Sequence, residues 1–367
     1  MKILFADLDR EWRGGQSQAL LTLRGLRATG HDVTLLAAKD APLATRSAAA
    51  QIPVIEIPRA TLRLSAAKSL RAIVRKHRFD LVHLNEPHAL TAAWLAGVHK
   101  RLPLLLSRRI GFPLKKNLIS QARYRAVTRF LPNSRAVAQS LIDSGIASPR
   151  ISVVNEGVEI PALTLPQARA ASRQAYGIVE NEFLFGCVSV FVKEKGQRHL
   201  IAALPKVRAN HPATRLLLAG DGACRGELES LANELHQSNA VLFPGFVQNV
   251  DAVYAALDAF AFPSEFEGLG TALQTAMALA LPCISTARGA LGEVVENDRT
   301  ALVIEPTGEE FAAAMIRVIE DPTLRERLGA AARDQIRLRF SAERMVENTL
   351  KIYAEVLGEE KKAIKRA

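Results

Sequence analysis

Residues 262–278 read FPSEFEGLGTALQTAMA, and this stretch decides the fold class more clearly than any other part of the chain. It starts at the end of an apolar segment of strand length, passes through a glycine-containing loop and enters a helix of small residues near Gly270. The N–H groups at the start of that helix can bind phosphate or sugar oxygens. Glu267 can accept hydrogen bonds from sugar hydroxyls. The stretch therefore predicts one strand–loop–helix unit of an α/β sheet, with a ligand-binding loop after the strand.

Short apolar segments alternate with longer helical patterns along the whole chain. Alternation of this kind is typical of a parallel sheet with helices on both faces. We expect residues 153–161 to form a strand that runs into a turn and a proline, after which the pattern restarts. The sequence therefore predicts two consecutive, doubly wound, Rossmann-like domains. The segments expected as strands are residues 2–6, 33–37, 54–57, 81–84 and 102–107 before the restart, and 184–190, 215–219, 240–243, 259–262, 282–285 and 301–304 after it.

Length and composition agree with this interpretation and exclude several protein classes. A chain of 367 residues is long enough for two domains. With 49% hydrophobic and 23% charged residues it is neither disordered nor a coiled-coil rod. No uncharged apolar run is long enough to cross a bilayer, and residues 1–7 suggest a buried strand rather than a signal peptide. The three cysteines are widely separated, which favours a reducing cytoplasm and argues against a disulfide framework or a zinc site.

Positive charge is concentrated in the first part of the chain. Residues 1–160 hold 25 Lys and Arg against 11 Asp and Glu, whereas the rest of the chain holds 23 against 26. Two basic segments, residues 63–78 and 108–129, could meet anionic lipid headgroups, a phosphorylated acceptor or only solvent. Nucleic acid is disfavoured, because the basic segments contain no stacking motif of interleaved aromatic residues.

Two further glycine-containing loops follow expected strands. Residues 13–16, RGGQ, open a helix after the first strand, and their glycines would let a phosphate or sugar approach the backbone. Residues 193–196, KEKG, follow the first strand of the second domain, where Lys195 could reach an anionic diphosphate. Each loop could also be an ordinary turn.

Taken together, the motifs resemble those of the retaining glycosyltransferases of the GT-B fold, family 4 (group 1), over nearly the whole chain. Their order and spacing carry the resemblance. The motifs are Gly14-Gly15, DLVH at 80–83, NEGV at 155–158, EKG at 194–196, AGDG at 219–222, PGF at 244–246, residues 263–278, and EVV at 293–295.

The resemblance implies a nucleotide-sugar donor held mainly by a second domain, residues 161–340, with its diphosphate in a cleft facing a first, acceptor-binding domain, residues 1–160. It also implies that a C-terminal helix within residues 341–367 packs back on the first domain. Lys195 and Glu267 would be catalytic, in a transfer with retention through an oxocarbenium-like transition state. Neither a metal nor a cofactor beyond the donor is implied. The donor-binding residues would be Gly15, Lys195, Phe246, Val247, Glu267, Gly268, Leu269, Gly270, Thr271 and Thr275.

Three positions depart from the family pattern. Thr275 stands where the family has a second glutamate that binds the ribose, so ribose recognition must use Thr275, Gln274 or another group. An arginine expected on the strand before the Lys-Gly pair is missing, and Lys193 could replace its phosphate contact. Arg108 and Arg109 occupy the region where many relatives have a histidine, which would favour an anionic acceptor.

These features together predict a glycosyltransferase, cytoplasmic or peripheral on the inner face of the cytoplasmic membrane. The acceptor would be a lipid-linked or phosphorylated saccharide, as in lipopolysaccharide-type envelope glycans, bound by Glu86, His88, Arg108 and Arg109. A GT-B nucleotide-sugar epimerase and a non-catalytic nucleotide-sugar-binding protein are the alternatives. The sequence does not predict the donor base or sugar, the linkage, or the oligomeric state.

Overall fold

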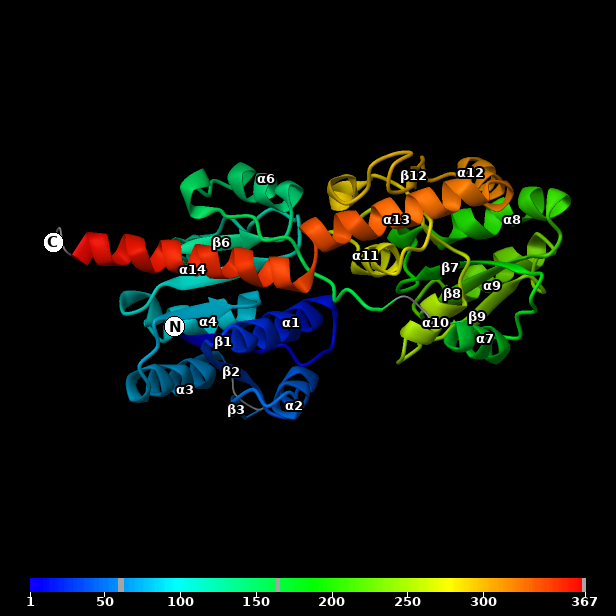
Figure 1. Ribbon diagram of the computed structural model, residues 1–367. Coiled ribbons are helices and arrows are strands. Elements are labelled where there is room, and N and C mark those ends of the chain that lie inside the picture. Colours follow the sequence, from blue (N-terminus) through cyan, green and yellow to red (C-terminus); the bar gives the residue numbers. More distant parts are fainter. Residues whose placement is uncertain (59–62, 163–165, 365–367) are drawn as a thin grey trace. The chain divides into compact units, whose positions relative to one another are not determined.

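The computed structural model describes residues 1–58, 63–162 and 166–364. The chain forms two compact units (Figure 1). Unit 1 comprises Met1–Gly157 and the described part of Ala342–Ala367, and unit 2 comprises Val158–Ser341. Each unit contains its own parallel sheet and hydrophobic core. Residues 163–165 and 365–367 of the expected domains, and the Arg63 side chain of the first basic segment, lie outside the described structure.

Unit 1 is built on a six-stranded parallel sheet of order β3-β2-β1-β4-β5-β6. Core clusters lie against it on both faces, which explains why its strands appear as continuous apolar runs. The strands are β1 Lys2–Asp7, β2 Asp32–Ala38, β3 Val54–Ile57, β4 Leu81–Leu84, β5 Leu104–Arg108 and β6 Arg129–Pro132. The helices between them are α1 Gly14–Ala28, α2 Pro42–Ala49, α3 Arg63–Lys76, α4 Pro87–Leu95, α5 Leu118–Arg125 and α6 Arg135–Asp143, with short 3₁₀ turns η1 Val98–Lys100 and η2 Ser148–Arg150.

The last helix, α14 Ala342–Ile364, packs on unit 1 although it is far away in the sequence (Figure 1). Val346 lies directly against Gly25 of α1, so the two helices approach closely where α1 has no side chain. Tyr353 is completely buried, and its hydroxyl is hydrogen-bonded to Nδ1 of His83 in β4. Burial and the nearby Arg109 charge lower the pKa of His83 to about 3, so this histidine is neutral and structural.

Unit 2 repeats the topology with a second parallel sheet of order β12-β11-β10-β7-β8-β9. Its strands are β7 Phe183–Val188, β8 Thr214–Ala219, β9 Val241–Gly245, β10 Ala259–Phe262, β11 Cys283–Ser285 and β12 Leu302–Val303. Its helices are α7 Pro166–Ala175, α8 Gln197–Asn210, α9 Arg225–Glu234, α10 Asp251–Ala256, α11 Thr271–Ala278, α12 Gly308–Glu320 and α13 Pro322–Arg339, with 3₁₀ turns η3 Lys193–Lys195 and η4 Gly289–Glu293. The prediction of two parallel α/β domains is confirmed.

The strand expected at residues 153–161 is wrong. The chain makes an isolated bridge to β6 at Ile151, Val154 N–H donates to the Pro132 carbonyl at 2.9 Å, and Val158 forms a second isolated bridge, with Ser341. Between the two bridges, Gly157 N–H donates to a side chain, Oε1 of Gln18 in α1, at 3.1 Å. The sixth strand is instead β6, which the expected strands did not include.

Candidate active site

In unit 2, the loops after β7 and β10 lie directly against each other at the carboxyl edge of the sheet. Glu265 N–H donates to the Glu194 carbonyl at 2.8 Å, which joins the two loops through their backbones. Gly196 has φ +65, and a Cβ at this position would collide with the Pro263 carbonyl. The glycine after Lys195 is therefore required by the close approach of the two loops.

This approach brings Lys195 and Glu267 together, the two residues predicted to be catalytic. Their side chains form an ion pair and are 18% and 16% exposed, respectively. The buried hydroxyl of Ser264 lies 3.3 Å from the same carboxylate oxygen. An ammonium group placed here can neutralise a departing diphosphate, and the carboxylate can hold a sugar hydroxyl. Without ligand, each neutralises the other.

The rest of the predicted donor loop surrounds this pair. Gly270 caps α11 with φ +64, and Gly268 precedes it in the same loop. Gly289 of η4 has φ +62, and a Cβ there would meet the Glu267 carbonyl at 2.5 Å, so η4 supports the loop from behind. Leu269 is buried in the core, which leaves only its backbone available to a ligand.

The two threonines of the predicted donor set lie one turn apart in α11. The Thr275 hydroxyl donates to the Thr271 carbonyl at 2.9 Å, so it is used within the helix. The neighbouring Gln274 is fully buried, with Nε2 donating to the Leu269 carbonyl at 3.3 Å. Neither the Thr275 hydroxyl nor the Gln274 amide therefore takes the place of the free glutamate carboxylate that the family has at position 275.

The remaining donor candidates of unit 2 lie after β9 and in η3. Phe246 is 80% exposed and Val247 is half-buried, next to Gly245 with φ +78. Lys193 lines a cavity of about 440 Å³ with residues of α8 and α9, among them Glu227. Lys193 and Lys195 therefore have different surroundings, although they are two residues apart.

In unit 1, a pocket of about 280 Å³ opens at the carboxyl edge of the sheet. It contains all four residues predicted to bind the acceptor, and also Gly15, which was predicted to bind the donor. The residues lining it include Asp9, Arg13, Gly15, Gln16, Asn85, Glu86, His88, Ser107, Arg108, Arg109, Ile110, Leu114 and Tyr124.

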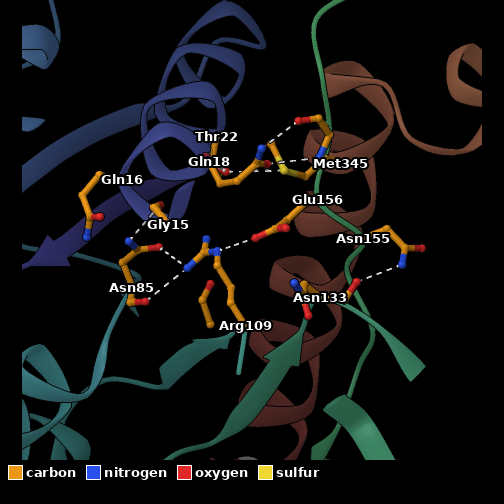
Figure 2. Close-up of polar contacts among 12 residues, drawn as sticks. Gly15, Gln16, Gln18, Thr22, Asn85, Arg109, Asn133, Asn155, Glu156 and Met345 are labelled. Atoms are coloured by element: carbon orange, nitrogen blue, oxygen red, sulfur yellow. Dashed lines mark hydrogen bonds and ion pairs between the residues drawn. The ribbon is translucent and has the colours of Figure 1, made fainter. Parts of the chain in front are cut away.

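Arg109 is held in a polar network at this pocket (Figure 2). Its Nε lies 2.9 Å from Oε1 of Glu156, and its Nη1 donates to Oδ1 of Asn85 at 2.9 Å. Asn85 Nδ2 in turn donates to Oδ2 of Asp7 at 2.6 Å, and Gln16 Nε2 donates to the same oxygen at 3.1 Å. The charge of Arg109 is thus already compensated.

The sequence-based prediction did not include Asp7, Asn85 or Glu156. Asp7 is completely buried at the carboxyl end of β1, and this burial raises the pKa of its carboxyl group. The position of Asp7 in the sequence could have indicated this network, because a carboxylate at the end of a buried parallel strand must have hydrogen-bond partners. The sequence did not indicate the ion pair of Glu156, because its partner Arg109 lies 47 positions away.

Arg108, the last residue of β5, has different surroundings. Its Nη2 donates to the Phe112 carbonyl at 2.7 Å, and within the described residues it forms no ion pair. Burial lowers its pKa. Arg108 is therefore a pocket cation that forms an ion pair with no carboxylate of the described residues.

Glu86 caps α4 from inside the same pocket. Its Oε1 accepts from the N–H groups of Leu8 at 3.1 Å and Ala89 at 2.6 Å, and Oε2 accepts from His88 N–H. Burial, and secondly the charge of Asp7, raise the pKa of Glu86 to about 7. The His88 side chain is exposed. Glu86 is consequently both a helix cap and a group that titrates near neutral pH.

The described residues offer neither a metal site nor a membrane-spanning helix. No three His, Cys, Asp or Glu side chains are grouped so that they could hold a metal ion. No helix in this part of the chain is both long and apolar enough to cross a membrane. The cysteines Cys187, Cys224 and Cys283 are free thiols.

Comparison with known proteins gives matches to both units. The profile of the family described as Glycosyltransferase Family 4 matches residues 12–160, and that described as Glycosyl transferases group 1 matches residues 168–335. A GDP-mannose-dependent monoacylated alpha-(1-6)-phosphatidylinositol monomannoside mannosyltransferase of Corynebacterium glutamicum is 31% identical over 216 residues, covering 56% of each chain. The N-acetyl-alpha-D-glucosaminyl L-malate synthase of Bacillus anthracis is 32% identical over 191 residues, covering 52% of this chain and 50% of the synthase.

The matched region spans about half the length of these curated relatives. A solved structure matches over more of the chain: HepE of Anabaena, in complex with UDP and glucose, has a TM-score of 0.82 at 24% identity and covers 96% of this chain and 99% of its own. This likeness shows a shared fold. Because the two family profiles together span both units and the fold agrees, the chain belongs to the group 1 glycosyltransferases of the GT-B fold.

Proposed function

We propose that the protein transfers a sugar, with retention, from a nucleotide-sugar donor to a lipid-linked or phosphorylated saccharide of a cell-envelope glycan. The observation that carries the proposal is the Lys195–Glu267 pair at the carboxyl edge of the unit 2 sheet. It lies in the part of the chain that the group 1 profile matches. A bound donor separates this pair, and its diphosphate and its sugar become the new partners of Lys195 and Glu267.

The chemistry follows from the charges that develop during transfer. As the sugar–phosphate bond breaks, negative charge grows on the diphosphate, and Lys195 stabilises it more strongly than in the ground state. Glu267 leaves the ammonium group and accepts hydrogen bonds from the sugar hydroxyls. We include no metal ion and no further cofactor in this mechanism.

The acceptor side of the proposal rests on the unit 1 pocket. Arg108 supplies a cation there that no carboxylate of the described structure neutralises, which favours an anionic acceptor. The two relatives support this choice, since their names specify a phosphatidylinositol mannoside and L-malate, both anionic acceptors.

The segment that follows Arg109 supports a membrane-bound acceptor. Exposed apolar side chains lie at Ile110, Phe112, Leu118 and Ile119, in a segment that also contains Lys115 and Lys116 and no acid. Apolar groups beside cations suit an anionic bilayer surface. We therefore place the protein peripherally on the inner face of the cytoplasmic membrane.

A panel of nucleotide sugars tests the proposal. UDP-, GDP-, ADP- and TDP-sugars are added singly and thermal unfolding is followed, because a ligand that binds only the folded protein raises its apparent stability. The stabilising donor is then incubated with and without envelope lipid extract. Transfer to lipid supports the proposal. Interconversion of sugars without acceptor would indicate an epimerase, and binding without turnover would indicate a binding protein; either result would overturn it.

A further inference from the structure

A second cavity in unit 1, of about 540 Å³, lies at the end of the sheet opposite to the acceptor pocket. It is formed where α3 and α4 finish, before the chain enters β4 and β5. Arg71 and Arg75 of α3 line one wall, and Trp94 at the end of α4 lines another. Residues 95–101, which include η1, complete it. The proposed sugar transfer makes no use of this cavity.

The cavity carries a concentrated positive charge, and none of the described residues that line it is acidic. The cations are Arg71, Arg75, Lys100 and Arg101. None of these four side chains has an ion pair or a hydrogen bond within the described part of the chain. Arg71 and Arg75 are one helical turn apart, a spacing at which like charges repel. In addition, Nδ1 of His99 is buried without a hydrogen-bond partner.

We propose that this cavity is a binding site for a phosphate-bearing ligand, separate from the donor and acceptor sites. Guanidinium groups such as those of Arg71 and Arg75 bind phosphate oxygens through charge-assisted hydrogen bonds, and Lys100 and Arg101 add two further cations. A bound phosphate removes the repulsion among the cations, and therefore binds the folded protein preferentially. The phosphate belongs either to a soluble oligophosphate or to an anionic lipid headgroup.

Trp94 provides a local signal for the test, because the chain has only two tryptophans. In a Trp12→Phe protein the emission reports on Trp94 alone. This protein is titrated with pyrophosphate, with phosphatidylglycerol vesicles and with neutral phosphatidylcholine vesicles. The same titrations are made on Arg71→Gln/Arg75→Gln, and on Lys68→Gln/Lys76→Gln as a matched control. The control removes two exposed cations of α3 that do not line the cavity.

We expect a saturable change in Trp94 emission with pyrophosphate or with phosphatidylglycerol vesicles. The Arg71/Arg75 variant should bind about tenfold more weakly or worse, since two charge-assisted contacts are lost, and the control should bind like the parent. A response to pyrophosphate identifies a soluble ligand, and a response to the anionic vesicles alone identifies a headgroup. No response, an equal response to neutral vesicles, or equal loss in both variants overturns the proposal. Unfolding curves of both variants verify that they fold.

Discussion

Arg108 and Arg109 are adjacent in the sequence but have different surroundings. Arg109 is paired with Glu156 and bonded to Asn85, whereas the Arg108 guanidinium donates to the Phe112 carbonyl and pairs with no carboxylate in the described part of the chain. Breaking a largely buried ion pair leaves the second charge desolvated and uncompensated. Arg109 is therefore a positioning residue for the pocket, and Arg108 is its available cation.

This difference predicts effects of different size for two glutamine variants. Arg109→Gln should lower the free energy of unfolding by about 2 kcal/mol, because Glu156 stays buried without its cation. Arg108→Gln should change it by less than about 1 kcal/mol. Urea unfolding measures both, and Arg109→Gln/Glu156→Gln should recover part of the loss. Equal effects of the two single variants would contradict the assignment.

Glu86 makes the stability of unit 1 depend on pH. Its pKa is raised from an ordinary value of 4.5 to about 7, so the folded protein binds more protons than the unfolded chain between these values. Stability therefore falls as pH rises through this window, by about 3 kcal/mol at most. In Glu86→Gln this contribution is absent. We expect its stability relative to the parent to increase from pH 4.5 to 7.5, measured by urea unfolding; a constant difference would show that Glu86 does not titrate there.

At the scale of elements, the contact of α14 with α1 depends on a glycine. A Cβ at Gly25 would run into Val346, whereas a Cβ at Gly226 in α9 meets nothing within 4 Å. Gly25→Ala should destabilise the protein by about 1–3 kcal/mol through overpacking. Gly226→Ala should stabilise it by up to about 1 kcal/mol through helix propensity. Thermal unfolding compares them, and adding Val346→Ala to Gly25→Ala should restore stability. Loss of stability in both glycine variants would argue against this packing.

The segment of exposed apolar residues after Arg109 gives a second prediction for an element. Leu118→Ser/Ile119→Ser should reduce pelleting with phosphatidylglycerol vesicles severalfold, because both side chains are exposed. Leu338→Ser, at an exposed leucine of unit 2, is the control. High salt should also weaken the binding of the parent protein. Indifference to lipid charge, or an equal effect of Leu338→Ser, would remove the support for a peripheral protein.

Most strands could be predicted because they are buried on both faces, so their sequences are continuous apolar runs. The sixth strand of unit 1 could not, since β6 has only two apolar residues between Arg129 at one end and Pro132 at the other. Residues 153–161 show the opposite error, a strand that was predicted but does not form. Their apolar pattern suits a strand, but Gln18, distant in the sequence, takes the Gly157 N–H group instead of a neighbouring strand.

At the scale of the whole molecule, the repeated pattern predicted both sheets, and the resemblance supplied the candidate residues. Sequence spacing could not place Lys195 against Glu267, because that contact depends on how two loops 72 positions apart pack. It also gave no sign of the Asn85–Arg109–Glu156 network, which joins three separate segments of unit 1. That Gly15 contacts the donor phosphates stays a prediction, as do the roles of Phe246, Val247 and Thr275.

The central claim is that Lys195 stabilises the departing diphosphate. The most direct measurement is kcat for sugar transfer by Lys195→Ala and by Lys193→Ala, two lysines of the same 3₁₀ turn. Lys195 is paired with Glu267, whereas Lys193 lines a different cavity, so we assign the phosphate contact to Lys195 and not to Lys193. The account predicts that Lys195→Ala lowers kcat by about 100-fold or more, while Lys193→Ala stays within about threefold of the parent, with both proteins folded. A Lys195→Ala protein that transfers sugar as fast as Lys193→Ala would contradict it.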